Sequence, residues 1–254
     1  MTKSIDIIGD IAIIRFSEKS LWIYKKFFSW KFLRKNKNIK TILEKKGDIE
    51  GELRIFKTKF LTGENKKETI HKENNSQFYL HIDKTYFSPR LSNERALVSE
   101  EISNEIKRNS NILVMFAGIA PFPIVIAKHL KNKKIKAKII SSELNKDASE
   151  YAQRNVKLNK LEDYIEVIQG DSRRIKTLKK FDIILMTRPN LEETFLDSAL
   201  KYSKKGTLIY YHGFGIKEKI LEEVKNKRLK VLYIRKAGDI APGKYRWLVK
   251  MKVS

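Results

Sequence analysis

The fold is decided by one stretch of sequence, ILVMFAGIAPF at residues 112–122. Its opening run of apolar residues predicts a buried strand that ends at Phe116. Gly118 lets the backbone approach a ligand without a side chain in the way, and a helix is expected from about Pro123. Free N–H groups at a helix start can bind a carboxylate or phosphate group. The stretch therefore predicts a strand, a ligand-binding loop and a helix, although the loop alone could equally be an ordinary turn.

Strands and helices alternate from this stretch onward. Helical segments separate the earlier strands, at lengths that suit crossover connections. The pattern predicts an α/β fold with an open, mostly parallel sheet, helices on both faces, and ligands at the carboxyl ends of the strands. The further candidate strands are residues 138–142, 164–169, 181–186, 207–211, 231–235 and 246–253.

The N-terminal third has a different pattern. Residues 5–16 predict a hairpin that turns at Gly9-Asp10. Residues 21–43 alternate aromatic with basic side chains and predict a helix with an apolar and a basic face, in which we expect the aromatic rings to be core. Residues 49–82 are strand-like. We expect a small α+β domain at 1–82, a connector with a helix from Ser92 at 83–110, and a larger domain at 111–254.

Composition limits the function. Lysine and arginine number 54 against 30 acids, a net charge of +24, which attracts polyanions and favours nucleic acid as a partner. The alternative is a compositional bias without function.

No cysteine is present and the four histidines are scattered, so we expect no disulfide and no metal. A secretory signal and a long apolar run are both missing, which predicts a cytoplasmic protein without a membrane span; we also expect a monomer.

Polar residues follow the predicted strands in an informative order. Glu143 ends the second strand about 25 residues after Gly118, where an acid accepts hydrogen bonds from ribose hydroxyls. Asp171 and Ser172 end the third strand, where the adenine of an adenosine-containing cofactor would lie. The fourth strand ends at the loop 187–190, where the acceptor of a transferred group would meet that cofactor. Each has a simpler explanation as a cap or turn. Together, without a G-x-G-x-x-G loop, they favour S-adenosylmethionine over NAD or ATP.

Several longer strings make the pattern more specific. They are TIHKE at 69–73, YFSPRL at 86–91 with Glu94 and Arg95, MFAG at 115–118, and NVKLN at 155–159. On these strings the chain resembles the archaeal and eukaryotic-type tRNA (guanine-37-N1)-methyltransferases over nearly its whole length. The resemblance implies a Rossmann-like class I methyltransferase domain, S-adenosylmethionine as cofactor and tRNA as partner.

The resemblance also implies roles for individual residues. Glu94 matches the general base that takes the guanine N1 proton, and Arg54 matches an arginine that holds the base and stabilises its charge. Without the resemblance, Glu94 and Arg95 would be interpreted as a helix-terminus pair with other charges, and Arg54 as a charge on a strand face. Thr187 is the third residue to which the resemblance gives a catalytic role. The implied cofactor-binding residues are Phe116, Gly118, Glu143, Asp171 and Ser172, and the implied RNA-binding residues are Arg90, Arg95, Arg188 and Pro189.

Two positions depart from the family pattern. Ala120 stands where a second glycine is usual, and Thr187 where most members have Asn. Thr187 and Glu143 together indicate an archaeal branch that also methylates a wyosine precursor. We expect the chain to lack the separate domain that grips the outer corner of tRNA, so that RNA affinity rests on the basic helix and depends strongly on salt. The alternatives are an aminocarboxypropyl transferase of the wyosine pathway and a non-catalytic RNA-binding relative.

Overall fold

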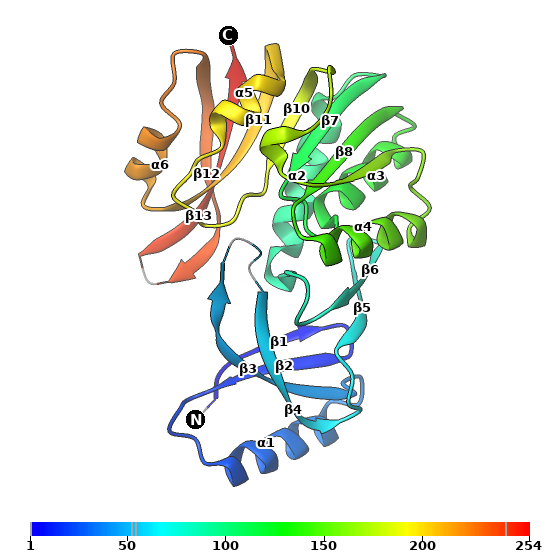
Figure 1. Ribbon diagram of the computed structural model, residues 1–254, viewed down its shortest axis with the longest axis vertical. Coiled ribbons are helices and arrows are strands. Elements are labelled where there is room, and N and C mark those ends of the chain that lie inside the picture. The colour runs from blue at the N-terminus through cyan, green and yellow to red at the C-terminus, as the bar shows by residue number, and fades with distance from the viewer. Residues whose placement is uncertain (1, 52, 54, 242) are drawn as a thin grey trace. The chain divides into compact units, whose positions relative to one another are not determined.

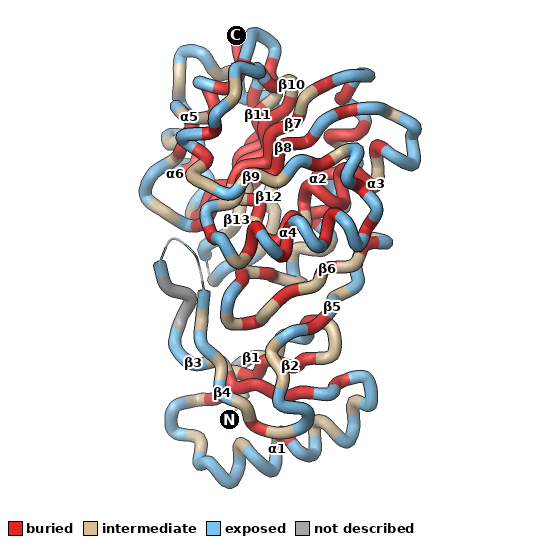
Figure 2. Tube along the Cα trace, turned by 45° about the vertical axis from the view of Figure 1, so that its right-hand side comes forward, coloured by how far each residue is buried: buried red, intermediate tan, exposed pale blue. Residues whose placement is uncertain are grey.

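The chain folds into two compact units, residues 1–90 and 91–254, in a computed structural model that describes residues 2–51, 53, 55–241 and 243–254. Each unit has its own sheet and its own buried apolar cluster (Figures 1 and 2). The helix expected in the connector belongs to the second unit. No helix in the described part of the chain is both long and apolar enough to cross a membrane.

The first unit contains a four-stranded sheet, a two-stranded sheet and a helix. The larger sheet has the order β1-β2-β3-β4, in which β2 and β3 are parallel and the other pairs antiparallel. The predicted hairpin is confirmed, and it turns at Gly9, whose φ of 56° favours glycine. The elements are β1 (Thr2–Ile8), β2 (Ile11–Phe16), α1 (Trp22–Lys35), β3 (Thr41–Glu50), β4 (Ile55–Gly63), β5 (Glu68–Glu73) and β6 (Ser76–His81).

The helix α1 is shorter than the sequence pattern predicted. It ends at Lys35, where the backbone N–H and the side-chain Nδ2 of Asn36 both donate to Phe32 O, at 3.1 and 2.8 Å. The predicted continuation to Leu43 is wrong because residues 41–44 pair with β2 and bury Ile42 completely. Branched residues gain more from packing in that sheet than from extending a helix.

The aromatic residues of α1 divide between two sides of the helix. Phe28 and Phe32 pack against the core of the first unit. Trp22, Phe27 and Trp30 are instead 49, 62 and 48% exposed. The expectation that these aromatic rings are core is therefore wrong for three of them.

The second unit contains a seven-stranded sheet with helices. The sheet order is β12-β13-β11-β10-β7-β8-β9, and all pairs are parallel except the two that β13 makes. This confirms the predicted α/β fold with a mostly parallel sheet. Its elements are α2 (Ser92–Glu105), β7 (Ser110–Met115), α3 (Pro121–Asn132), β8 (Ala137–Glu143), α4 (Lys146–Leu158), β9 (Ile165–Gln169), β10 (Phe181–Met186), α5 (Leu196–Tyr202), β11 (Ser203–Gly215), α6 (Lys217–Glu223), β12 (Leu229–Ala241) and β13 (Lys244–Val253), with short 3-10 turns at Pro89–Leu91 and Ser172–Arg174.

Both faces of this sheet are buried. Leu113 and Met115 belong to an apolar cluster with side chains of α5 and α6, and the alternating residues Ile112 and Val114 are buried on the opposite face. The chain runs from β7 to β8 and β9 on one side, then returns to β10 on the other. The carboxyl ends of β7 and β10 therefore flank the point where the strand order reverses, which is where open α/β sheets bind ligands.

Candidate functional site

The loop after β7 has an unusual backbone. Phe116, Gly118 and Ala120 have φ values of 61°, 59° and 66°, all in the left-handed region. A side chain with a β-carbon adopts this region at a cost of about 1–2 kcal/mol. Such conformations persist where the surrounding structure enforces them, and they are common in ligand-binding loops. Ala120, the first departure from the family pattern, is fully buried and precedes α3 in this conformation.

Glu143, at the end of β8, is bound to this loop. Its Oε2 accepts the Gly118 N–H at 2.7 Å, and its Oε1 accepts the Asn145 N–H at 2.8 Å. Burial raises the pKa of the Glu143 carboxyl, although the backbone donors act in the opposite direction. An ionised carboxylate has about four acceptor positions, more than these backbone donors fill. The remaining capacity fits a ribose whose two hydroxyls donate to Glu143.

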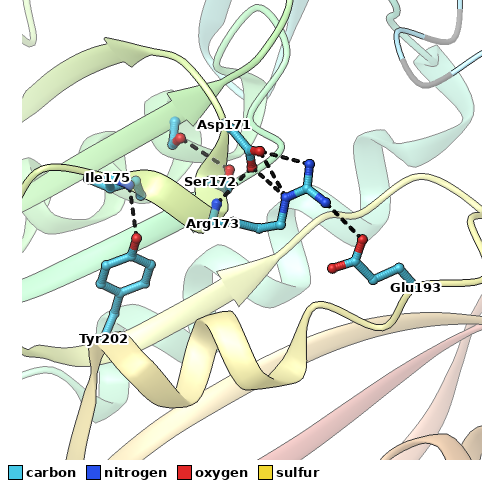
Figure 3. Close-up of polar contacts among 7 residues, drawn as sticks. Asp171, Ser172, Arg173, Ile175, Glu193 and Tyr202 are labelled. Carbon is cyan, nitrogen blue, oxygen red and sulfur yellow. Dashed lines mark hydrogen bonds and ion pairs between the residues drawn. The ribbon is translucent and has the colours of Figure 1, made fainter.

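The end of β9 lies beside Glu143. Gly170 N–H donates to Glu143 O at 2.8 Å, and the Ser142 and Ser172 hydroxyl oxygens are 3.1 Å apart and buried. Figure 3 shows that the Asp171 carboxylate is held by Arg173, with Nε at 2.8 Å from Oδ2. The Arg173 guanidinium and backbone N–H keep the pKa of Asp171 below its usual value despite some burial. Asp171 and Ser172, predicted to lie beside the adenine, are therefore adjacent to Glu143, the acid predicted to bind the ribose.

The loop after β10 is joined to the end of β7. Thr187 Oγ1 is 3.1 Å from Met115 O and 2.9 Å from Phe116 O, so its hydroxyl connects the ends of β10 and β7. Further along the loop, the Phe195 ring lies edge-on to Phe116 at 4.8 Å between centroids. Glu193 accepts from Arg173 Nη1 at 3.1 Å, which connects the loop to the end of β9 (Figure 3).

Arg188, a predicted RNA-binding residue, is buried inside this loop. Its Nη1 donates to Leu191 O at 2.7 Å and to Glu193 O at 3.1 Å, and its Nη2 donates to Glu223 at 3.2 Å. Only 2% of the residue is exposed, and Pro189 is also buried. The guanidinium therefore shapes the loop from within. Pro189 and Asn190 do not begin a helix, since α5 starts at Leu196.

Glu94 lies in the first turn of α2 and is 5% exposed. Its Oε1 is 3.2 Å from His212 Nε2, and Arg235 donates from Nη1 to Oε2 at 2.7 Å and from Nη2 to Oε1 at 3.1 Å. Burial acts to raise the pKa of Glu94, but hydrogen bonds from His212 and Arg235 outweigh it and hold the pKa below its usual value. Burial lowers the pKa of His212. The site therefore holds an ionised carboxylate beside a neutral imidazole.

Contacts within the second unit connect this carboxylate to the other site residues. The His212 ring is 5.7 Å from the Phe122 ring, in the first turn of the helix that follows the loop 116–120. The helix α2 is fixed to β13, because Lys250 Nζ donates to Glu101 at 2.8 Å and to Glu105 at 2.7 Å. Glu94 is thus positioned by His212 of β11 and Arg235 of β12, while its helix is fixed to β13.

Sequence reasoning missed His212 and Arg235. They follow Glu94 by 118 and 141 residues, and no local motif connects them to it. The sequence signal that could have identified His212 was its position near the end of β11, a strand that neighbours β10.

The remaining predicted residues lie in different surroundings. Arg90 forms an ion pair with Asp6 at 2.7 Å within the first unit. Arg95 is 1% exposed, next to Glu94 on α2. Arg54 lies outside the described residues.

A separate cavity of about 460 Å³ lies at the opposite edge of the sheet, at the start of β7 and β8, and is lined by residues such as Ser110 and Ala137. Among the residues that the structure describes, no His, Asp and Glu cluster could hold a metal ion.

Comparison with known proteins gives consistent matches. Residues 69–239 match the TRM5/TYW2 methyltransferase domain, and residues 1–66 match the TYW2 N-terminal domain. The chain is 35% identical to tRNA (guanine(37)-N(1))-methyltransferase Trm5b of Pyrococcus abyssi, over 99% of this chain and 75% of that protein. It is 33% identical to the tRNA (guanine(37)-N(1))/4-demethylwyosine(37)-methyltransferase Taw22 of Nanoarchaeum equitans, over 96% of this chain and 97% of that protein.

Solved structures agree with these sequence matches. The complex of aTrm5 with tRNALeu superposes with a TM-score of 0.86 at 32% identity, covering 99% of this chain and 72% of that one. One relative differs in the group it transfers. The tRNA(Phe) (4-demethylwyosine(37)-C(7)) aminocarboxypropyltransferase of Methanocaldococcus jannaschii is 32% identical, over 96% of both chains.

Proposed function

Because the chain belongs to the TRM5/TYW2 methyltransferase family, we propose that it transfers a methyl group from S-adenosylmethionine to N1 of guanosine 37 in tRNA. The observation that carries this proposal is the buried, ionised carboxylate of Glu94, held by Arg235 and His212 in the same unit as the cofactor loops. Methylation of guanine at N1 needs a base, because that nitrogen carries a proton.

The cofactor is expected to bind at the carboxyl ends of β7, β8 and β9. Glu143 has acceptor capacity for the ribose hydroxyls, and Asp171 and Ser172, at the end of the next strand, are the proposed contacts on the adenine side. Phe116 and Gly118 supply the loop nearest to the methionine part. When bound, S-adenosylmethionine supplies an electrophilic methyl group on a sulfonium. An adenosine complex of a related Trm5, 30% identical to this chain, supports binding of this kind of ligand.

The chain's own residues then act on the guanine. Glu94 accepts the N1 proton, and the N1 electron pair forms the new bond to the methyl carbon as the bond to sulfur breaks. Arg54 remains a candidate to stabilise negative charge on the base during this step. Thr187 contributes by fixing the loop on which the base would rest, since its hydroxyl binds the end of β7. Arg90 remains a proposed RNA contact, whereas Arg95 and Arg188, which are 1 and 2% exposed, act inside the fold.

A nucleoside analysis tests the proposal. An unmodified tRNA transcript with guanosine at position 37 is incubated with the protein and S-adenosylmethionine, digested, and analysed by mass spectrometry. The expected product is 1-methylguanosine, and a transcript with adenosine at position 37 should give none. Methylation of both transcripts, or of neither, contradicts the proposal.

A second acceptor is favoured by the similarity to Taw22 over nearly the whole of both chains. We propose that the protein also methylates 4-demethylwyosine at position 37, and tRNA carrying that base tests this in the same assay. Transfer of an aminocarboxypropyl group is the competing reaction, favoured by one relative. Product mass separates the two, because a methyl group adds one carbon and an aminocarboxypropyl group adds four.

A further inference from the structure

One side of α1 exposes aromatic side chains to solvent. Ile23, Phe27, Trp30 and Arg34 are spaced by four, three and four residues, so they lie along one stripe of the helix. Ile23 is 76% exposed, and Trp22 beside it is 49% exposed. Figure 2 shows much of α1 in the exposed colour, whereas its other side packs against the sheet of the first unit. Exposed large apolar side chains grouped in this way indicate a contact surface.

Positive charges lie on these rings. Arg34 Cζ is 4.8 Å from the Trp30 ring centroid, and Lys26 Nζ is 5.0 Å from that of Trp22. Lys59 of β4 reaches the same Trp22 ring at 4.6 Å. The helix contains five basic residues and no acid. We call this surface the α1 face, and it consists of Trp22, Lys26, Phe27, Trp30, Arg34 and Lys59.

The distribution of charge identifies the kind of partner. Protein interfaces are enriched in aromatic residues and arginine but depleted of lysine, and a helix that lies on a membrane separates its apolar face from its charged one. On the α1 face, the cations and the rings are interleaved. Surfaces that bind unpaired nucleotides combine aromatic platforms for bases with cations for phosphates. The net charge of +24 adds a general attraction for polyanions.

We propose that the α1 face binds tRNA, with unpaired bases stacking on Trp22, Phe27 or Trp30 and with Arg34 and Lys59 contacting phosphates. The inference rests on the proposed function, since it takes tRNA as the substrate. It assigns to the aromatic rings a binding role in addition to that of the basic residues. The face does not include any residue of the candidate catalytic site.

Three variants of Trp30 separate stacking from apolar contact. Trp30→Phe keeps an aromatic face, Trp30→Leu keeps apolar area without one, and Trp30→Ala keeps neither. Binding of a fluorescent tRNA transcript to the full chain is measured by anisotropy. Since a stacked base contributes about 1–3 kcal/mol, Trp30→Leu and Trp30→Ala should each raise Kd about fivefold or more, and Trp30→Phe should stay close to the parent. The KM for tRNA should rise in the same order, with kcat unchanged at saturating tRNA.

Charge is tested with a matched pair of arginines. Arg34→Ala should reduce the slope of log K against log salt by about 0.7–0.9, the effect of losing one phosphate contact. Arg228→Ala removes the same charge from an exposed position in the second unit, and it should leave the slope unchanged. Thermal unfolding shows whether each variant is folded.

The outcomes distinguish this inference from the proposed function. Equal tRNA affinity of Trp30→Leu and the parent overturns the inference, even when methyl transfer is normal. Loss of self-association in Trp30→Ala with unchanged tRNA affinity also overturns it and identifies a contact between copies of the chain. Weaker tRNA binding by Trp30→Leu, in a protein that transfers no methyl group, supports the α1 face and contradicts the function.

Discussion

Arg235 Nη1 lies 2.7 Å from Glu94 Oε2, and the second guanidinium nitrogen lies 3.1 Å from Oε1, although 141 residues separate the two in the sequence. The paired geometry holds the carboxylate in one orientation and favours its ionised form. It also makes Glu94 a weaker base than an isolated glutamate. In the proposed mechanism, Arg235 would therefore affect both how strongly Glu94 accepts a proton and how far the pH can fall before Glu94 loses its charge.

Removal of that arginine should change how activity depends on pH. Glu94 must be ionised to accept a proton, and its pKa is now lowered, so activity is lost only as the pH falls through that low value. In Arg235→Gln the pKa of Glu94 rises, and the acid limb of the kcat profile should move to higher pH. Arg235→Lys, which retains the charge, should move it less. An unchanged acid limb in Arg235→Gln would show that Glu94 is not the ionising group.

The Glu94 carboxylate itself can be replaced by its amide. Glu94→Gln preserves size but cannot take a proton, so kcat should fall by about 10²–10⁴-fold. Cofactor affinity, measured by calorimetry, should remain near that of the parent because Glu143 and Asp171 are untouched. Glu100→Gln, an exposed position on the same helix, is the control. Full activity of Glu94→Gln would exclude this residue from the chemistry.

Glu143 is expected to control cofactor affinity. In Glu143→Gln the neutral amide loses charge-assisted hydrogen bonds, each contributing about 1.5–3 kcal/mol, so the Kd for S-adenosylmethionine should rise at least about tenfold. The tRNA affinity should not change. Glu166→Gln, on the neighbouring strand and exposed, provides the comparison. Similar cofactor affinity in both variants would place the ribose elsewhere.

Ala120 offers a test of stability. Its φ of 66° favours glycine, and the strain of about 1–2 kcal/mol exceeds the entropy cost of about 0.4–1 kcal/mol that glycine adds through the unfolded state. Ala120→Gly should therefore stabilise the protein and raise Tm slightly. Ala127→Gly, inside α3 with ordinary helical backbone, should lower Tm, with a propensity cost of about 1 kcal/mol. A lower Tm for Ala120→Gly would mean that the methyl group packs more favourably than its strain costs.

The sequence pattern predicted the parallel sheet well because its strands are buried on both faces. Ile112–Met115 and Ile183–Met186 are continuous apolar runs that solvent-facing structure would not contain. The proximity of the candidate cofactor residues was predictable for a related reason. In a parallel sheet, the order of strands brings each strand-end residue to the same edge, so Gly118 and Glu143 meet.

Other features depended on contacts that local pattern does not encode. The end of α1 was mispredicted because Ile42 belongs to a strand that pairs with β2, about 30 residues earlier in the sequence. Helix periodicity is a local pattern and does not reveal such a pairing. Its aromatic rings resembled core residues, yet Trp30 and Phe27 lie on the outer side. Arg188 was expected at the substrate because of its position after β10, and only the folded loop shows its guanidinium turned inward.

The strand β13 lies between β11 and β12, and it also supplies Lys250, which fixes the helix that carries Glu94. Ribosomes deliver β11 and β12 before the strand that joins them. A nascent chain therefore has an open edge on β11, and an α2 that lacks its two bonds from Lys250, until residues 244–253 have emerged. The seven-stranded sheet and the support that Lys250 gives to α2 are therefore complete only when this last strand has been made.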